Sequence, residues 1–472
     1  MPKRNLLLLS LITAMSLVAW LARDHGREAR QIGEVLGAIE RSYLRPVDPD
    51  ELATAAIDGI VATLDEHSAV VDGAARRELE AALDQEFGGV GLELTSAPEG
   101  IVVHAPIVGG PAWRAGIAAG DAIVAIDGVD TRGLAVRDAV AILRGDIGSS
   151  VVLGLRRAVA DRGIDGVRAV DEGRSVTLLR EVVRTQSVLG DRRLSDGSWD
   201  WFVEGEPGVG FVRITSFGER TAAELDAALA TIAAAPALRG LVIDLRGNPG
   251  GLLTAAVDVC DRFLDDGLIV SMRRRGAGRV DVMEPRRATP GAVLAGVPIA
   301  VLVDGLTASA AEIVAACLQD HARAVVVGTR SFGKGTVQSI MPLSDGRRLL
   351  KLTTAEYVRP RAGGDSERSA HGAWAVAPDA GREIDVTAQA RAALETWRRR
   401  RDAPPVSGAD GQPEAGVSAG DLPRQIDSVL ALALEALPSR EADFSGEEEA
   451  AGDADEAVSA GDAAGPGDGR GG

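Results

Sequence analysis

The stretch Leu241-Val242-Ile243-Asp244-Leu245-Arg246-Gly247-Asn248-Pro249-Gly250-Gly251 predicts the fold class of this 472-residue chain. Its first five residues have the length and apolar character of a buried strand, and its glycine-rich end is typical of a tight turn. A similar apolar run, Ile299 to Val303, leads into a predicted helix from Thr307 to Leu318. Buried strands that alternate with helices of this length indicate crossover connections. We therefore predict an α/β core with a largely parallel sheet.

Two turns follow these predicted strands, and sites in open α/β sheets form beyond the carboxyl ends of strands. Ser309 stands at the start of the predicted helix, where it is either an N-cap or a nucleophile. For a nucleophile, the Ala310 N–H and the positive end of the helix would stabilise an oxyanion. Gly250 and Gly251 either supply a second amide N–H or only form a tight turn.

Lysine is rare in this chain, which has 51 Lys and Arg residues but only three lysines, Lys3, Lys334 and Lys351. Arginine can replace a lysine that supplies only charge, but a guanidinium does not lose its proton at any workable pH. Lys334 lies between two glycines, and burial there would lower its pKa and make the neutral amine available. Lys334 is therefore our candidate base, with a lysine retained on a surface loop as the alternative.

Two neighbouring features bear on this base. Strand alternation places Gln338 on the same face as Lys334, where it could orient the amine or be an exposed polar residue. The Asp320–His321 pair is a poor base for Ser309, because 11 or 12 helical residues rise about 16–18 Å.

The N-terminus carries a predicted membrane segment. Lys3 and Arg4 precede an apolar run from Leu6 to Ala22, which is close to the lower limit of about 17 residues for crossing a bilayer. Trp20 fits a signal peptidase site poorly, so we predict an uncleaved signal anchor over residues 1–25, with a cleaved signal peptide as the alternative. The remainder is then expected on the periplasmic or extracytoplasmic face of the cell envelope.

Composition excludes some classes of function. The net charge of −18 and the 3% aromatic content argue against nucleic-acid binding. Residues 441–472 hold ten acidic side chains against one arginine, which predicts a disordered acidic tail. Cys260 and Cys317 lie in apolar helical segments and are expected as free buried thiols, although the sequence does not exclude a disulfide. No metal-ligand spacing is present, so neither a metal nor another cofactor is expected.

Several motifs follow one another between residues 36 and 440. They are Leu64–Ser68, Phe87–Gly91, Ala115–Ile117, Gly120–Ile123, Leu143–Gly145, Asp244–Gly251, Thr307–Ile313, Leu318–His321 and Phe332–Gln338. In these motifs the chain resembles the C-terminal processing (tail-specific) peptidases, S41-type serine peptidases with a Ser/Lys dyad. The resemblance implies a crotonase/ClpP-like peptidase core. It also implies an N-terminal helical region over 26–86, an inserted PDZ domain over 87–157, and a core with a C-terminal helix over 158–440.

The resemblance also assigns roles to residues. It implies that Ser309 is the nucleophile, Lys334 the general base and Gln338 the support of that lysine. A charge-relay role for Asp320 is a weaker assignment, because the helix separates it from Ser309. The loop Gly89-Val90-Gly91-Leu92 would hold the carboxylate of a substrate C-terminus in amide donors, although its glycines could equally form a bulge.

The predicted function is therefore that of an exported serine endopeptidase. Its PDZ domain would capture unstructured or C-terminally exposed proteins, and Ser309 would form an acyl-enzyme that water hydrolyses. A homo-oligomer is possible. The alternatives are a non-catalytic PDZ scaffold that binds protein C-termini and a crotonase-like acyl-CoA enzyme.

Overall fold

The computed structural model describes residues 26–97, 100–163, 166–276, 279–360, 374–404 and 427–437. The chain forms two compact units, one of residues 1–76 and 338–353 and the other of residues 77–337 and 354–472. The predicted signal anchor and the predicted acidic tail lie outside the described residues. Within the described ranges, no helix has both the length and the apolar character needed to cross a membrane.

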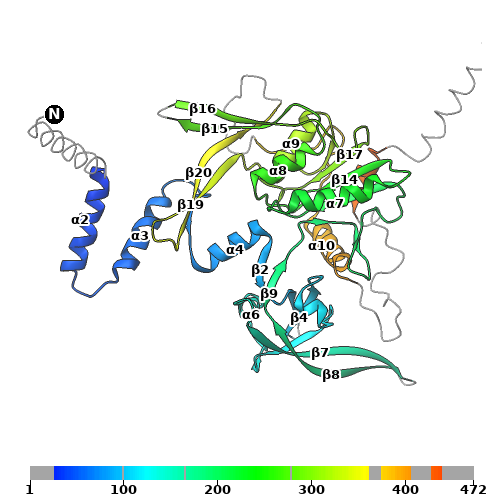
Figure 1. The fold of residues 1–472 in the computed structure, drawn as a ribbon, viewed down its shortest axis with the longest axis horizontal. Helices are drawn as coiled ribbons and strands as arrows, with labels where there is room; N and C mark the ends of the chain where they lie inside the picture. The colour runs from blue at the N-terminus through cyan, green and yellow to red at the C-terminus, as the bar shows by residue number, and fades with distance from the viewer. Residues whose placement is uncertain are drawn as a thin grey trace, which may run out of the picture. The chain divides into compact units, whose positions relative to one another are not determined.

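The smaller unit combines helices with short strands (Figure 1). Asp48 caps α3 by accepting a hydrogen bond from the Asp50 N–H, and Pro49 occupies the first turn of this helix, where its missing N–H costs nothing. The short strand β1 pairs antiparallel with β20, and Ala69 of β1 lies opposite Lys351 of β20. The elements of this unit are α2 (Arg27–Ser42), α3 (Pro49–Val61) and β1 (Ala69–Val71), with the parts of β19 (Thr336–Pro342) and β20 (Leu349–Val358) that lie between residues 338 and 353.

The region predicted to be a PDZ domain forms a six-stranded sheet in the larger unit. Its order is β3-β4-β5-β7-β8, with β6 paired to β5, so β3 lies at one edge. The long β7–β8 hairpin carries the sheet to Leu179, beyond residue 157. The elements here are α4 (Gly73–Asp84), β2 (Glu86–Gly89), β3 (Leu92–Ala97), β4 (Gly100–Pro106), α5 (Pro111–Arg114), β5 (Ala122–Ile126), β6 (Val129–Asp130), α6 (Val136–Leu143), β7 (Ser150–Gly163), β8 (Gly166–Leu179) and β9 (Glu181–Arg184).

A second sheet of the larger unit has the order β10-β13-β14-β17-β18. The last four strands are parallel, and only β10 is antiparallel to its neighbour. The largely parallel α/β core predicted from the apolar runs is therefore confirmed. Its strands are β10 (Val188–Leu189), β13 (Val209–Ile214), β14 (Gly240–Asp244), β17 (Ile299–Val303) and β18 (Val325–Gly328).

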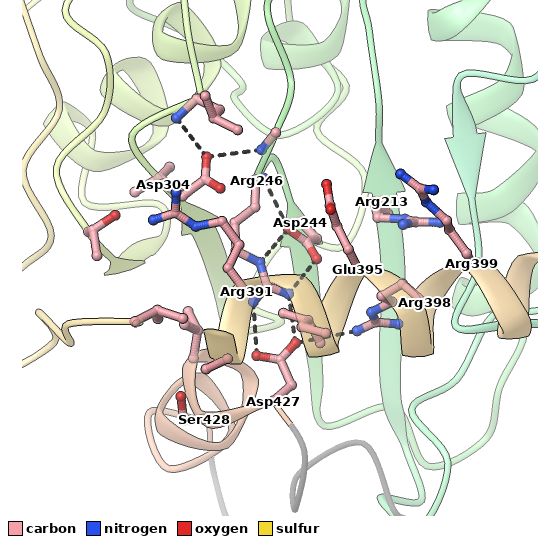
Figure 2. Close-up of a pocket in the computed structure, with 18 of the residues that line it drawn as sticks. Arg213, Asp244, Arg246, Asp304, Arg391, Glu395, Arg398, Arg399, Asp427 and Ser428 are labelled. Carbon is pink, nitrogen blue, oxygen red and sulfur yellow. Dashed lines mark hydrogen bonds and ion pairs between the residues drawn. The ribbon is translucent and has the colours of Figure 1, made fainter. Parts of the chain in front are cut away.

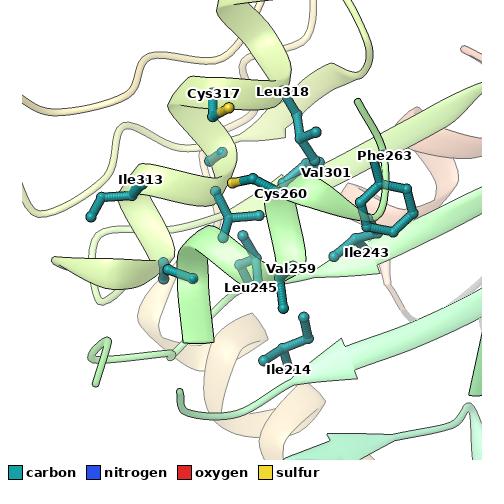
Figure 3. Packing of buried hydrophobic residues seen from close by; sticks show 14 of the residues in the cluster. Ile214, Ile243, Leu245, Val259, Cys260, Phe263, Val301, Ile313, Cys317 and Leu318 are labelled. Atoms are coloured by element: carbon teal, nitrogen blue, oxygen red, sulfur yellow. The ribbon is translucent and has the colours of Figure 1, made fainter. Parts of the chain in front are cut away.

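Helices cover both faces of this parallel sheet. Successive side chains of a strand point to opposite faces of the sheet. Ile243 and Val301 therefore lie in one buried cluster with residues of α7, α8 and α9, whereas Val242 and Ala300 lie in another cluster with residues of α12. Cys260 on α8 and Cys317 on α9 are buried in the first cluster as free thiols, which confirms that expectation (Figure 3). The helices are α7 (Thr221–Ala233), α8 (Leu253–Asp261), α9 (Ala310–Asp320), α10 (Ala388–Asp402) and α12 (Ser428–Leu434).

The remaining strands form short pairs and a hairpin beside the core. The hairpin of β15 and β16 also pairs with β20, with Met272 opposite Tyr357. This pairing matters below, because it fixes the position of Tyr357. The strands are β11 (Arg192–Arg193), β12 (Trp199–Asp200), β15 (Leu268–Gly276) and β16 (Arg279–Arg287).

Candidate active site

Ser309 lies in the turn that joins β17 to α9. Its backbone has φ 55° and ψ −118°, a conformation that non-glycine residues rarely adopt. Asp304 fixes the turn, since its carboxylate accepts hydrogen bonds from the backbone N–H groups of Leu306 and Thr307 at 3.0 and 3.1 Å. Ser309 is thus a buried residue held in a strained conformation at the start of a helix, as nucleophiles often are.

The glycine-rich turn after β14 packs directly against Ser309. Gly250 has φ +100°, and a Cβ atom there would lie 2.9 Å from the Ser309 Cβ and 3.0 Å from the Ala310 nitrogen. The Gly250 N–H itself donates to the Asn248 side chain at 2.8 Å. Within the described part of the chain, no residue accepts a hydrogen bond from the amides of Ala310 or Gly251. These two amides are therefore available to a ligand, whereas the Gly250 amide is engaged.

Glu312 connects the turn of Ser309 to the loop of Lys334. Its Oε2 accepts the backbone N–H of Ser309 at 2.8 Å and that of Lys334 at 2.9 Å. Because both nitrogens lie within 2.9 Å of one oxygen atom, they cannot be further apart than twice that distance. The structure thus brings the two residues predicted as nucleophile and base together.

The second oxygen of the same carboxylate holds the rest of the lysine loop. Oε1 accepts the Ser331 hydroxyl at 2.5 Å and the Gly333 N–H at 2.6 Å. Glu312 is fully buried, and this burial raises its pKa although the four hydrogen bonds act in the opposite direction. Our sequence reasoning did not single out Glu312. The pattern Ser309-x-x-Glu312 is a capping-box signature and could have identified it.

Tyr357 is a second residue that the sequence reasoning missed. Its backbone N–H donates to the Gly335 carbonyl at 2.8 Å, and its ring packs against Trp374 with 5.8 Å between the ring centroids. Burial raises the pKa of Tyr357 to about 12, and the hydrogen bond from Ser309 lowers it by less. The phenol is therefore neutral at ordinary pH. The only sequence signal for Tyr357 is the scarcity of tyrosine, since the chain has just two tyrosines.

Gln338 belongs to the smaller unit, while Ser309 and Lys334 belong to the larger one. The Gln338 amide donates to the Thr353 hydroxyl at 3.2 Å, and that hydroxyl donates to Asp65 at 3.1 Å. The predicted support of Lys334 by Gln338 therefore remains a prediction.

Asp320 ends α9, at the opposite end of the helix from Ser309. The helix has 11 residues, which corresponds to about 16 Å of rise. The Asp320 carboxylate forms an ion pair with Arg359 at 2.8 Å. The structure therefore does not bring Asp320 to Ser309, and the ion pair gives Asp320 a structural role.

The predicted carboxylate-binding loop joins β2 to the edge strand β3. Gly89 ends β2, opposite Glu181, and Leu92 begins β3. The carbonyl groups of Val90 and Gly91 accept hydrogen bonds from Ala112 and Ile107 at 2.9 and 3.0 Å. These bonds fix the loop, so any carboxylate would have to be bound by its amide N–H groups.

A cavity of about 270 Å³ lies between α10, α12 and the carboxyl ends of β14 and β17. Figure 2 shows Arg246 at its centre, held between Asp244 and Asp427. Arg246 donates to both carboxylate oxygens of Asp427 at 2.8 and 2.7 Å. Since Asp427 also caps α12 through the Leu430 N–H, this network ties the glycine-rich turn to the C-terminal helix.

Comparisons with known proteins identify the family of the chain and its PDZ domain. Residues 208–380 match the model of peptidase family S41, and residues 102–157 match a PDZ domain model. The chain is 35% identical over 353 residues to the carboxy-terminal-processing protease of Bartonella bacilliformis, covering 74% of this chain and 75% of that protein. It is 34% identical over 343 residues to the carboxyl-terminal-processing protease of Picosynechococcus sp., covering 72% and 70%. A solved photosystem II D1 C-terminal processing protease aligns with 80% of this chain and 98% of its own, at 26% identity and a TM-score of 0.41.

Proposed function

Since this chain belongs to peptidase family S41, the carboxy-terminal processing serine proteases, and carries their PDZ domain, we propose that Ser309 is its nucleophile and Lys334 its general base. One observation carries this proposal, namely that the backbones of both residues are bound to the same oxygen of Glu312. Two loops that are far apart in the sequence are thereby fixed as one unit, as a nucleophile and its base require.

The proposed reaction is an acyl transfer. The neutral Lys334 amine takes the proton of the Ser309 hydroxyl as the Ser309 oxygen attacks a peptide carbonyl. The amides of Ala310 and Gly251 stabilise the oxyanion, assisted by the positive end of α9. The lysine ammonium returns the proton to the leaving amine, and water hydrolyses the acyl-enzyme with Lys334 again as base. No step requires a metal or an organic cofactor.

The PDZ domain is proposed to select substrates by their C-termini. Its strand β3 is at the edge of the sheet, so a peptide could extend the sheet by pairing with it. The amide groups of Gly89 to Leu92 would then bind the terminal carboxylate. Unstructured or C-terminally exposed proteins are the substrates that suit this mode of binding, because their ends are free to adopt a strand.

We also propose that the peptidase is exported and anchored by its N-terminal segment, as the basic residues Lys3 and Arg4 before the apolar run suggest. Fractionation of cells that express the full chain tests this proposal. Recovery of the intact chain in the cytosolic fraction would contradict it.

The test of the catalytic assignment is cleavage of an unstructured protein with a free apolar C-terminus. Ser309→Ala and Lys334→Arg should each abolish cleavage, because the first removes the nucleophile and the second a base that can be neutral. Lys351→Arg is the matched control, since it makes the same exchange at the other described lysine, and it should remain active. Appreciable turnover by Ser309→Ala or by Lys334→Arg defeats the assignment. A wild-type protein that binds the substrate without cutting it would also defeat the assignment and would indicate a non-catalytic scaffold.

A further inference from the structure

We propose that Asp65 and Thr353 are positioning residues that fix the orientation of the Gln338 amide. The carbonyl oxygen of this amide is thereby the end that accepts a hydrogen bond from Lys334. The inference deepens the proposed function, because it rests on Lys334 as the general base and on the predicted support of that lysine by Gln338. Asp65, Thr353 and Gln338 all belong to the smaller unit.

Thr353 lies between the other two side chains. Its hydroxyl oxygen accepts a hydrogen bond from the Gln338 Nε2 at 3.2 Å, and the hydroxyl donates to the Asp65 Oδ1 at 3.1 Å. Its backbone N–H donates to the Ser68 hydroxyl at 3.1 Å. Thr353 is thus attached to the turn of residues 65–68 through both its backbone and its side chain.

The Asp65 carboxylate is fixed by the turn that it begins. Its Oδ1 accepts the backbone N–H groups of His67 and Ser68, both at 2.9 Å, and its Oδ2 accepts the Ser68 hydroxyl at 3.0 Å. Desolvation acts to raise the pKa of Asp65, but the hydrogen bonds from His67, Ser68 and Thr353 lower it below its usual value. The carboxylate is therefore ionised at neutral pH, and it acts only as an acceptor.

The direction of each hydrogen bond follows from the protons available. Because an ionised carboxylate can only accept, the single hydroxyl proton of Thr353 is used in the bond to Asp65. The Thr353 oxygen can then only accept from Gln338, and the NH₂ end of an amide is the end that donates. The NH₂ group and the carbonyl oxygen of an amide point in different directions from one carbon. The Gln338 carbonyl oxygen is therefore turned away from Thr353.

This orientation suits a base that must keep its lone pair for the nucleophile. The neutral amine and the ammonium of a lysine both have N–H groups, which a carbonyl oxygen can accept. A reversed amide would present its NH₂ group instead, and this group would donate to the lone pair of the neutral amine. The Lys334 lone pair would then be occupied when the Ser309 hydroxyl has to give up its proton. A carbonyl end fixed toward the lysine leaves that lone pair available.

The first test is Thr353→Val in the full chain, because valine keeps the branched shape of the side chain and leaves the bonds of Asp65 within its own turn. We expect kcat to fall about tenfold with little change in KM, since the amide loses the partner that fixes its orientation. Thr353→Ser restores the hydroxyl and should restore kcat. Thr63→Val is the matched control, since Thr63 lies in the same unit and its exposed hydroxyl donates to the Ile60 carbonyl at 2.7 Å. A folded Thr353→Val protein with the wild-type kcat overturns the inference.

A double-mutant cycle separates positioning from a general contribution to the fold. If Thr353 acts through Gln338, Thr353→Val should change kcat little in a Gln338→Ala protein, whereas independent effects would multiply. Asp65→Ala should depend on Gln338 in the same way. Asp65→Asn keeps one oxygen for the Thr353 hydroxyl, so it should retain more activity than Asp65→Ala. Effects that multiply at both Asp65 and Thr353 would show a purely structural role and overturn the inference.

The proposed function fails on separate observations. Turnover by Ser309→Ala or by Lys334→Arg would contradict the nucleophile or the base, whatever the Thr353 variants do. If these two variants are inactive but Gln338→Ala keeps the wild-type kcat, the dyad stands and the inference about Asp65 and Thr353 is wrong.

Discussion

The backbone N–H groups of Ser309 and Lys334 donate to one oxygen atom, Oε2 of the buried Glu312 carboxylate, at 2.8 and 2.9 Å. The Phe332 N–H also donates to the Thr307 carbonyl at 2.9 Å, so this backbone bond and the shared acceptor together hold the turn after β17 against the loop after β18. Catalysis between a nucleophile and a base depends on such a fixed arrangement, because a displacement of about 1 Å can cost about a hundredfold in rate.

The first prediction concerns Glu312→Gln. A carboxylate accepts at both oxygens, whereas an amide offers one oxygen and turns an NH₂ group toward donors. Either orientation of the glutamine therefore leaves some of the four donors without a partner. We expect kcat/KM to fall by at least about tenfold, and unfolding free energy to fall by about 1–3 kcal/mol for each donor left unpaired in the interior.

Steady-state cleavage and urea unfolding measure these two effects. Glu395→Gln on α10 is the control, since Glu395 is exposed and the same exchange there should change neither quantity. An active Glu312→Gln protein would show that the shared carboxylate does not position the site.

The second prediction compares two glycines of the same turn. Gly250→Ala should strongly reduce activity, because its Cβ atom would meet the Ala308 carbonyl at 2.8 Å and the Ser309 Cβ at 2.9 Å. At Gly247, which has φ +69°, an added Cβ meets nothing within 4 Å. Gly247→Ala therefore bears only the backbone strain of about 1–2 kcal/mol. The ratio of the two kcat/KM values checks this prediction, and equal values would contradict it.

Much of the core could be predicted from local pattern. The apolar runs Leu241–Leu245 and Ile299–Val303 have the length of buried strands. Because sites in open α/β sheets lie at the carboxyl ends of strands, the glycine-rich and small-residue turns after these runs are predicted to form the site. The rejection of the Asp320–His321 pair also needed only the rise of a helix. The structure agrees, since Asp320 is paired with Arg359 rather than with Ser309.

The rest of the site depends on contacts between distant segments. Tyr357 reaches the loop of Lys334 only because β20 pairs with β15 in one register, and nothing in the local sequence fixes that register. The strained backbone of Ser309 arises from the turns packed around it, so no propensity predicts it. Strand alternation predicts that Gln338 supports Lys334, and this stays a prediction; the Gln338 amide donates a hydrogen bond to Thr353.

The third prediction concerns recognition of the substrate. If the amides of residues 89–92 bind a terminal carboxylate, a substrate that ends in a carboxamide should show a higher KM, by about tenfold for the loss of a charge-assisted hydrogen bond. Its kcat should change little, because the chemical step occurs elsewhere. Paired acid and amide forms of one peptide measure this. Equal KM values would show that the chain end is not what the enzyme recognises.

The fourth prediction concerns Asp427, which joins Arg246 of the glycine-rich turn to helix α12. Burial alone would raise the pKa of Asp427, but the charge and hydrogen bonds of Arg246, with the charge of Arg398, lower it to about 2. Because the folded pKa lies below the unfolded value of about 3.9, ionised Asp427 stabilises the fold above about pH 4. This stabilisation, roughly 2–3 kcal/mol, is lost as the pH falls toward 2.

Asp427→Asn removes the charge and leaves two buried guanidinium groups with less compensation. We expect it to lower the free energy of unfolding at pH 7 by about 3–5 kcal/mol, and to lose less stability than the wild type between pH 4 and pH 2. Urea unfolding at several pH values measures both effects, with the exposed Asp385→Asn as the matched control. A variant as stable as the wild type at pH 7, or equally sensitive to acid, would show that the Arg246–Asp427 pair does not hold the turn to the C-terminal helix.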